Sequence, residues 1–340
     1  MTTVFFATNR KKNGPGPLDY GSSSVANDPA ATTYAVAEVN VTLQNADAGT
    51  ITSVHDLNGG DFSAAVKTQI INAGRNLLIF IHGADNSFQD AIKRAAFNRE
   101  WFAASGHAAA DTTVVAFTWP SSNLFFAQGH NPRDEYFADQ VQAGKSSFHL
   151  QLFLKNIDKL RDDFQAAHPA GRVFLLAHSM GNLVLGGAVQ GFFDDHDPDN
   201  LIFDQVILAA PDEVRDTFDK PHHGRLAHLR KLSDRISVYY SRFDLLMVLS
   251  EAANHNTRLG FNGPEDKSDA AKFPEAKFRL VDCTDVFDYS RIGESSHQYY
   301  RKSEKVREDI VACMVDNPRP DGGNIPLFTQ AAGMQGGVGG

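Results

Sequence analysis

The segment "FLLAHSMGNLVLGGAV", residues 174–189, places a single hydroxyl, that of Ser179, between two apolar runs. The run before it, residues 173–176, is short and apolar throughout, which is typical of a strand covered on both faces. The run after it, residues 182–193, has the length and spacing of a buried helix. The segment therefore predicts a strand, a sharp turn at Ser179 and a helix.

A serine on such a turn is held in a strained backbone conformation, and the residues two positions away must be small. Here they are Ala177 and Gly181, so the sequence reads AxSxG, a variant of the GxSxG nucleophile elbow. The helix behind Ser179 directs its free N–H groups at an oxyanion formed there. A serine that only caps a core helix is the alternative interpretation, and other features must decide between them.

Short apolar runs alternate with stretches of helical period along the rest of the chain. The runs are residues 4–7, 77–81, 114–118, 173–176, 205–209, 236–240 and 278–281, and the helical stretches are residues 88–104, 147–167, 182–193 and 298–314. This alternation predicts an α/β fold with a mostly parallel central sheet and helices on both faces. Residues 33–43 alternate polar and apolar instead, which predicts an antiparallel strand at one edge.

Composition excludes several classes of protein. The 340 residues carry a net charge of −9, and the basic clusters at residues 10–12 and 225–231 are short, so no nucleic-acid partner is expected. Cys283 and Cys313 lack the spacing of a metal site or a disulfide framework. No run approaches the roughly 18 apolar residues of a membrane span. We expect a soluble, cytoplasmic protein, whose oligomeric state the sequence leaves open.

The same pattern predicts one domain over residues 1–325, followed by a flexible, glycine-rich tail at 326–340. Residues 192–203 and 212–224 are expected to form cap-like insertions over a pocket. The Gly- and Pro-rich stretches at 13–31 and 260–274 are expected to be surface loops.

The segment "LLIFIHGADNSF", residues 77–88, is a second candidate part of a site. Its strand ends at His82 and Gly83, beyond which the backbone can turn back toward Ser179. The N–H groups of Ala84 and Met180 would then form the two-donor oxyanion hole that acyl transfer requires. We interpret His82 itself as a core imidazole that orients this loop.

An acid and a base follow Ser179 in the order of a hydrolase triad. Asp244 ends "RISVYYSRFD" and His297 lies in "GESSHQYY", so both follow later strands and are expected at the same sheet edge as Ser179. A serine hydroxyl is a poor nucleophile at neutral pH, so an imidazole must take its proton and a carboxylate must orient that imidazole. Asp212 in "AAPDEV" and Asp285 are alternative acids, and strand order favours Asp244.

Together these segments resemble the α/β-hydrolases, and in particular a bacterial esterase/lipase-like branch known only as a domain of unknown function. The resemblance spans residues 4–310 and is carried by "VFFATNR", "IFIHGADNSF", "FTWPSS", "LLAHSMGN", "APDEVRDTF", "VYYSRFDLLM", "RLG" and "SSHQYY". It implies a triad of Ser179, Asp244 and His297 and the hydrolysis of an acyl bond. Ala84 departs from the pattern, because a bulkier aromatic residue usually follows His-Gly.

The expected activity is hydrolysis of a small-molecule or polymeric carboxylic ester through an acyl-enzyme, with no metal and no organic cofactor. The same site would serve an amidase, a lactonase, a polyester hydrolase or an acyltransferase. A non-catalytic binding module would predict a damaged triad. Trp119, His178 and Asp212 are the candidates for substrate contact.

Two polar clusters have simpler interpretations. Asp195, Asp197 and Asp199 alternate like the start of a calcium loop, but Asn200 replaces the glycine that such a loop needs, which favours a solvated acidic turn. The histidines of "PHHGRLAH", residues 221–228, do not share a helical face, so a surface cluster is expected.

Overall fold

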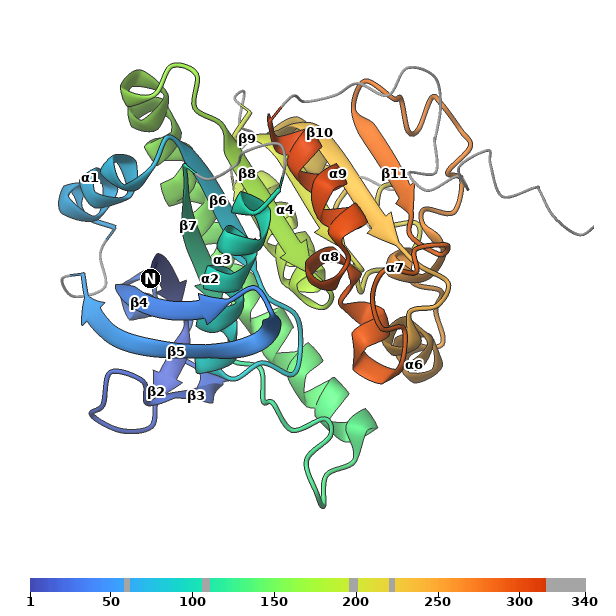
Figure 1. Ribbon diagram of the computed structural model, residues 1–340, viewed down its shortest axis with the longest axis horizontal. Helices are drawn as coiled ribbons and strands as arrows, with labels where there is room; N and C mark the ends of the chain where they lie inside the picture. Colours follow the sequence, from blue (N-terminus) through green and yellow to red (C-terminus); the bar gives the residue numbers. More distant parts are fainter. Residues whose placement is uncertain (58–61, 106–110, 196–200, 220–223, 316–340) are drawn as a thin grey trace, which may run out of the picture.

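The computed structural model describes residues 1–57, 62–105, 111–195, 201–219 and 224–315. A nine-stranded sheet of order β11-β10-β9-β8-β6-β7-β1-β4-β5 forms its centre (Figure 1). The strands are β1 Thr2–Thr8, β4 Thr33–Thr42, β5 Asn45–Asp56, β6 Asn76–Ile81, β7 Thr112–Thr118, β8 Val173–His178, β9 Phe203–Ala209, β10 Ser233–Tyr240 and β11 Phe278–Asp282. A small two-stranded sheet pairs β2, Arg10–Lys12, with β3, Tyr20–Ser24.

The pairing confirms the mostly parallel sheet that the apolar runs predict. Each of the seven runs lies within a strand, and all pairs from β1 across to β11 are parallel. Their carboxyl ends therefore lie along one edge, where ligands bind in open α/β sheets.

Helices cover both faces of this sheet, as expected. They are α1 Ala64–Ala73, α2 Phe88–Ala103, α3 Pro132–Ala167, α4 Gly181–Asp195, α5 Leu229–Leu232, α6 Leu245–Asn254, α7 Leu259–Asn262, α8 Tyr299–Lys302 and α9 Glu304–Val315. Alternate residues of β6 face opposite layers: Leu77 and Ile79 pack with α1, α3 and α4, whereas Leu78 and Phe80 pack with α2, α8 and α9. Within the described ranges, no helix combines the length and apolar character needed to cross a bilayer.

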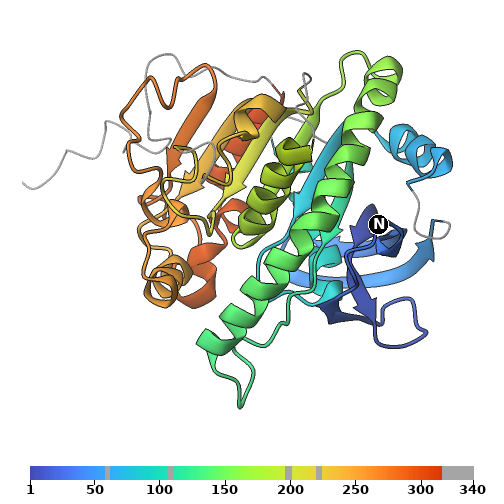
Figure 2. The same ribbon diagram turned by 180° about the vertical axis from the view of Figure 1, so that it is seen from behind.

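Three details correct the sequence-based expectations. The alternating strand at residues 33–43 is antiparallel, but β5 pairs beyond it and is the true edge. Helix α3 begins at Pro132, well before residue 147. Its first half extends past the sheet (Figure 2) and lacks a continuous buried stripe, so the apolar pattern did not reveal it. The expected helix at 298–314 is divided into α8 and α9 at Ser303.

Several expectations lie wholly or partly outside the described residues: the calcium alternative at 194–200, the histidines at 222 and 223, and the tail at 326–340. Of the expected insertion at 192–203, residues 192–195 continue α4 and Phe203 begins β9. The described part of the insertion at 212–224 consists mainly of turns and includes the pocket residue Asp212.

Gly181 shows how tightly the serine turn packs. A methyl group there would lie 2.4 Å from the carbonyl oxygen of His82 and 2.8 Å from that of Ile81. These are backbone atoms, which cannot rotate away as a flexible side chain would. The first helical turn of α4 therefore rests directly on the end of β6.

We predict that Gly181→Ala lowers the free energy of unfolding by about 1 to 3 kcal/mol through this overlap. Gly144→Ala is the matched control, because nothing lies within 4 Å of that position in α3. The control should raise stability by up to about 1 kcal/mol, the difference in helix propensity. Urea denaturation measures both changes, and equal effects at the two positions would contradict the packing described.

Candidate active site

Ser179 occupies the turn between β8 and α4 in a left-handed conformation, with a φ of 54° that is unusual for a residue other than glycine. Its N–H donates to the Ala209 carbonyl at 3.0 Å, and its own carbonyl accepts from the Asp212 N–H at 3.1 Å. The Asn182 amide also donates to that carbonyl, at 3.0 Å. These bonds tie the strained turn to the end of β9.

The His82-Gly83 loop packs against this turn. A methyl group at Gly83 would lie 2.7 Å from the Ser179 Cβ, so only glycine permits the approach. The approach brings the Ala84 and Met180 backbones next to the serine. Among the described residues, neither the Ala84 N–H nor the Met180 N–H has a hydrogen-bond acceptor, so both remain available to a ligand.

Buried polar groups hold the Gly83 loop in place. The Asn86 side chain donates to the carbonyls of Gly83 and Ala84 at 3.1 and 2.6 Å. Arg10, at the end of β1, donates to the Asn86 carbonyl at 2.8 Å. Burial lowers the Arg10 pKa to about 9, while Asp139 and Asp90 act in the opposite direction.

Asp139 on α3 was not identified from the sequence, yet it braces the same loop. Its Oδ2 accepts from the Asp85 N–H at 2.9 Å and from the Ser121 hydroxyl at 2.7 Å. The only sequence signal would have been a carboxylate on the buried side of a helix. The first half of α3 was not predicted as a helix, so this signal could not be recognised.

His82 and Trp119 form a buried pair outside the pocket. The rings stack at 5.2 Å, the Trp119 backbone N–H donates to His82 Nε2 at 3.0 Å, and its indole N–H donates to the His82 carbonyl at 2.8 Å. Burial, together with the charge of Arg10, lowers the His82 pKa well below its usual value. Trp119 is completely buried and is absent from the pocket lining, which corrects its expected contact with substrate.

His297 and Asp244 lie together, as the hydrolase order predicts. His297 ends the short 3-10 helix η2, Gly293–His297, and its Nδ1 donates to Asp244 Oδ2 at 2.7 Å. The other Asp244 oxygen caps α6 by accepting from the N–H groups of Leu246 and Met247, each at 3.1 Å. Both side chains are almost fully buried, so the imidazole has one fixed orientation.

His297 Nε2 is buried and has no hydrogen-bond partner among the described residues. With the proton on Nδ1, this nitrogen carries the free lone pair. His297 and Ser179 line the same pocket, although no hydrogen bond joins them. Catalytic hydrogen bonds are often long in ligand-free enzymes and shorten when substrate binds.

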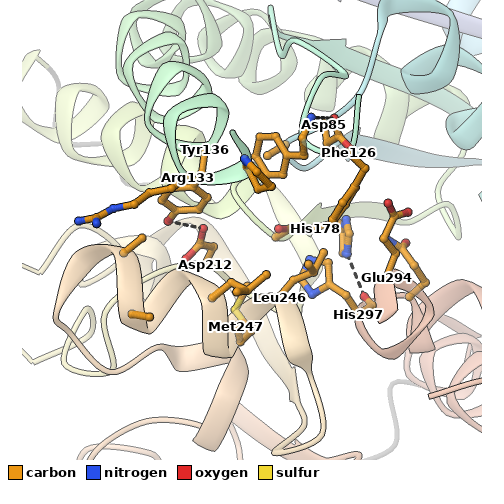
Figure 3. A pocket seen from close by; sticks show the side chains of 18 of the residues that line it. Asp85, Phe126, Arg133, Tyr136, His178, Asp212, Leu246, Met247, Glu294 and His297 are labelled. Carbon is orange, nitrogen blue, oxygen red and sulfur yellow. Dashed lines mark hydrogen bonds between the residues drawn. The ribbon is translucent and has the colours of Figure 1, made fainter. Parts of the chain in front are cut away.

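His178, next to Ser179, packs between two rings. Its ring centroid lies 4.6 Å from that of His297 and 4.6 Å from that of Tyr300, and its Nε2 donates to the His297 carbonyl at 3.2 Å (Figure 3). Burial and the neighbouring His297 lower the His178 pKa well below its usual value. His178 therefore lines the pocket as a neutral ring that supports His297.

Asp212, the rival acid, belongs to a separate network on the α3 and α6 side of the pocket (Figure 3). It accepts from Tyr136 at 2.9 Å and from Ser250 at 2.5 Å, and the Arg258 Nε lies 3.4 Å away. Burial and the Asp212 charge raise the Tyr136 pKa. The structure thus brings Asp244, and not Asp212, to His297.

These groups surround a pocket of about 240 Å³. Its lining residues come from the Gly83 loop, the loop before α3, α3, the end of β8 with the serine turn, the segment after β9, α6 and η2. They include Ala84, Asp85, Phe125, Phe126, Tyr136, His178, Ser179, Asp212, Leu246, Met247, Leu249, Glu294 and His297. Most of the wall is apolar, as in small-molecule sites. In the part of the chain that the structure describes, no three His, Cys, Asp or Glu side chains are grouped to hold a metal ion.

The pKa of Asp85, which lines the pocket, is raised toward neutrality. Burial raises its pKa to about 6, and the nearby Glu294 and Asp139 charges act in the same direction. A carboxyl group whose pKa is higher in the folded state binds more protons there than in the unfolded chain. Stability from this group is therefore present below pH 3.8 and is lost as the pH rises through about 6.

We predict that Asp85→Asn, which keeps the oxygen that accepts from the Phe125 N–H, removes the loss of stability that ionisation of Asp85 causes at higher pH. The melting temperature of the variant minus that of the wild type should be more positive at about pH 8 than at about pH 5. Thermal unfolding of both proteins at the two pH values measures this difference. A difference that is the same at both, or larger at the lower pH, would contradict the assignment.

The search of solved structures finds a predicted CIB-like hydrolase from Thermoplasma acidophilum, with 12% identity, a TM-score of 0.30, and coverage of 85% of this chain and 94% of that one. It also finds a lipase-esterase related protein from Clostridium acetobutylicum, with 12% identity, a TM-score of 0.29, and coverage of 70% and 93%. No curated protein matches the chain.

A family model described as alpha/beta hydrolase of unknown function (DUF900) matches residues 60–313, which is most of the chain. The matched range contains the elbow, the Gly83 loop, Asp244 and His297. The observed fold is the one that this description names. The chain therefore belongs to this family of α/β-hydrolases.

Proposed function

We propose that the protein is a serine hydrolase that cleaves a carboxylic ester. The observation that carries the proposal is the oriented His297 imidazole, which is bonded to Asp244 through Nδ1 and keeps a free Nε2 in the pocket that Ser179 also lines. In this arrangement a base, its orienting carboxylate and a hydroxyl on a strained turn have the roles of a catalytic triad.

The proposed reaction proceeds in two similar halves. His297 Nε2 takes the proton as the Ser179 oxygen attacks the ester carbonyl, and the imidazolium is stabilised by Asp244. The imidazolium then returns this proton to the departing alcohol, which leaves an acyl group on Ser179. Water repeats the attack with the same base, and the carboxylic acid is released.

The Ala84 and Met180 N–H groups are the proposed donors to the oxyanion in both halves. Support comes from their lack of other acceptors among the described residues and from the buried brace behind the Gly83 loop. Preorganised donors of this kind each contribute roughly 2.7 to 4 kcal/mol to transition-state stabilisation. In this scheme the nucleophile, the base, its carboxylate partner and the oxyanion donors all belong to the protein chain, and the ester and water are the reactants.

Esters are preferred to amides because an alcohol leaves more readily than an amine. Lactones, polyesters and transfer of the acyl group to an acceptor other than water use the same chemistry on Ser179. His178 and Asp212 are proposed to contact the substrate from opposite sides of the pocket, since both line it.

Labelling by a fluorophosphonate probe tests the nucleophile. The wild type should be labelled covalently, because the probe reacts with an activated serine, and Ser179→Ala should not be. Ser250→Ala is a suitable control, since Ser250 is a buried serine near the pocket that is bonded to Asp212 instead of an imidazole. A folded wild type that resists labelling, or a labelled Ser179→Ala variant, would rule out the proposed role.

A comparison of Asp244 with Asp212 tests which carboxylate orients the base His297. Asp244→Asn should lower kcat by about 10⁴-fold, because the amide favours the wrong imidazole tautomer. Asp212→Asn, which leaves the His297 bond intact, should have a much smaller effect. Steady-state rates with a nitrophenyl ester, normalised to folded protein, give both values, and the reverse ranking would transfer the role to Asp212.

A further inference from the structure

Exposed apolar side chains gather around the mouth of the pocket. Seven of the eleven large apolar residues that are exposed in the described ranges come from three segments there, and we call these seven the apolar rim: Phe126, Phe243, Leu245, Val248, Leu249, Phe287 and Ile292. Of the other four, Met1, Leu43 and Leu201 lie on segments that contribute no lining residue, and Val141 lies on α3 beyond the lining residue Tyr136. Single exposed apolar residues are normal, whereas a cluster marks an interaction site.

Helix α6 contributes the middle of the apolar rim. Leu245, Val248, Leu249 and Ala252 recur at the spacing of one helical face, and this face is exposed. The opposite face buries Met247 and Ser250. A surface helix of a water-exposed protein normally directs polar residues outward, so α6 has the pattern of a helix that is covered on both sides.

The C-terminal part of the rim is joined to α6 by specific contacts. The Arg291 guanidinium lies between two rings, 3.6 Å from the Phe243 centroid and 4.5 Å from the Phe287 centroid. The Leu245 N–H donates to the Ser296 hydroxyl at 3.1 Å. These contacts make residues 287–296 and the start of α6 one continuous surface at the end of the molecule where α6 lies in Figure 1.

The pocket opens within the apolar rim. Phe126 and Leu249 are 54% and 55% exposed, yet both also line the pocket. A protein partner bound permanently over the rim would close the route to Ser179. An occupant that supplies the substrate itself has no such conflict, and its acyl chain would pass directly between these two side chains.

Charge around the rim favours a neutral occupant. Three exposed or partly exposed arginines, Arg133, Arg242 and Arg291, are balanced by four exposed acids, Asp134, Asp285, Asp288 and Glu294. Binding to an anionic bilayer relies on an excess of basic residues, which this set does not provide.

We propose that the apolar rim docks on the surface of an aggregated, neutral, water-insoluble ester, and that the substrates are long-chain esters drawn from that surface. This inference rests on the proposed esterase function, because the docked surface is also the source of substrate. Leu245, Val248 and Leu249 enter the ester phase from α6, and Phe287 and Ile292 enter from the adjoining segment.

Flotation with triolein emulsion droplets tests docking without turnover, using the full chain carrying Ser179→Ala. That protein should float with the droplets. Adding Phe287→Ser and Ile292→Asp should lower the bound fraction by about tenfold or more, since each side chain contributes roughly 1.5 to 3 kcal/mol when buried. Leu201→Asp in the same background is the matched control, an exposed leucine just before β9 and therefore at the opposite sheet edge from the pocket, and should float as before.

In the active enzyme, the same double variant should lower the rate on triolein emulsion relative to the rate on soluble nitrophenyl acetate by about tenfold. Neither Phe287 nor Ile292 lines the pocket, so the soluble ester serves as the internal reference. The proposal would be overturned if the protein failed to float or if the rim variant floated equally well. It would also be overturned by binding only to anionic phosphatidylglycerol vesicles, or by a dimer that the rim variant dissociates. Flotation without hydrolysis would instead count against the esterase function alone.

Discussion

The architecture of the site depends on one close approach, that of the Gly83 loop to the serine turn. Ser179 has a backbone conformation that is costly for a side-chain-bearing residue, and it is sustained by hydrogen bonds with Ala209 at the end of β9 and with Asp212 just beyond it. Because Gly83 lacks a Cβ, the loop comes near enough to bring the Ala84 and Met180 backbones beside the serine. Asn86 within the loop, together with Arg10 and Asp139 from two distant parts of the chain, then fixes this loop in place.

Asp244 links the proposed chemistry to the pocket wall. One carboxylate oxygen orients His297, and the other caps α6, whose first turn supplies lining residues and part of the apolar rim. A single buried side chain therefore sets both the position of the base and the start of the helix beside which a substrate would enter.

The fold was predictable because its parallel strands are buried on both faces and leave continuous apolar runs. Strand order also predicts that Asp244 and His297 share one sheet edge, but it brings Asp212 to the same edge, and only the order of residues in hydrolase triads favoured Asp244. The edge strand β5 was missed because its residues are mostly half-exposed and carry few large apolar groups. The role of Asp139 and the burial of Trp119 depend on long-range packing, which leaves no local periodic signal. The α6 part of the apolar rim has a helical period, but the sequence does not show that this face is exposed.

The central claim is that Ser179, the Ala84 and Met180 N–H groups and His297 act on one reacting atom. A crystal structure of the protein inactivated by an alkyl phosphonate tests it most directly. The account predicts phosphorus bonded to the Ser179 oxygen, a phosphonyl oxygen within hydrogen-bond distance of both N–H groups, and His297 Nε2 beside the adduct. An adduct on another residue, or a phosphonyl oxygen directed away from the Gly83 loop, would contradict it.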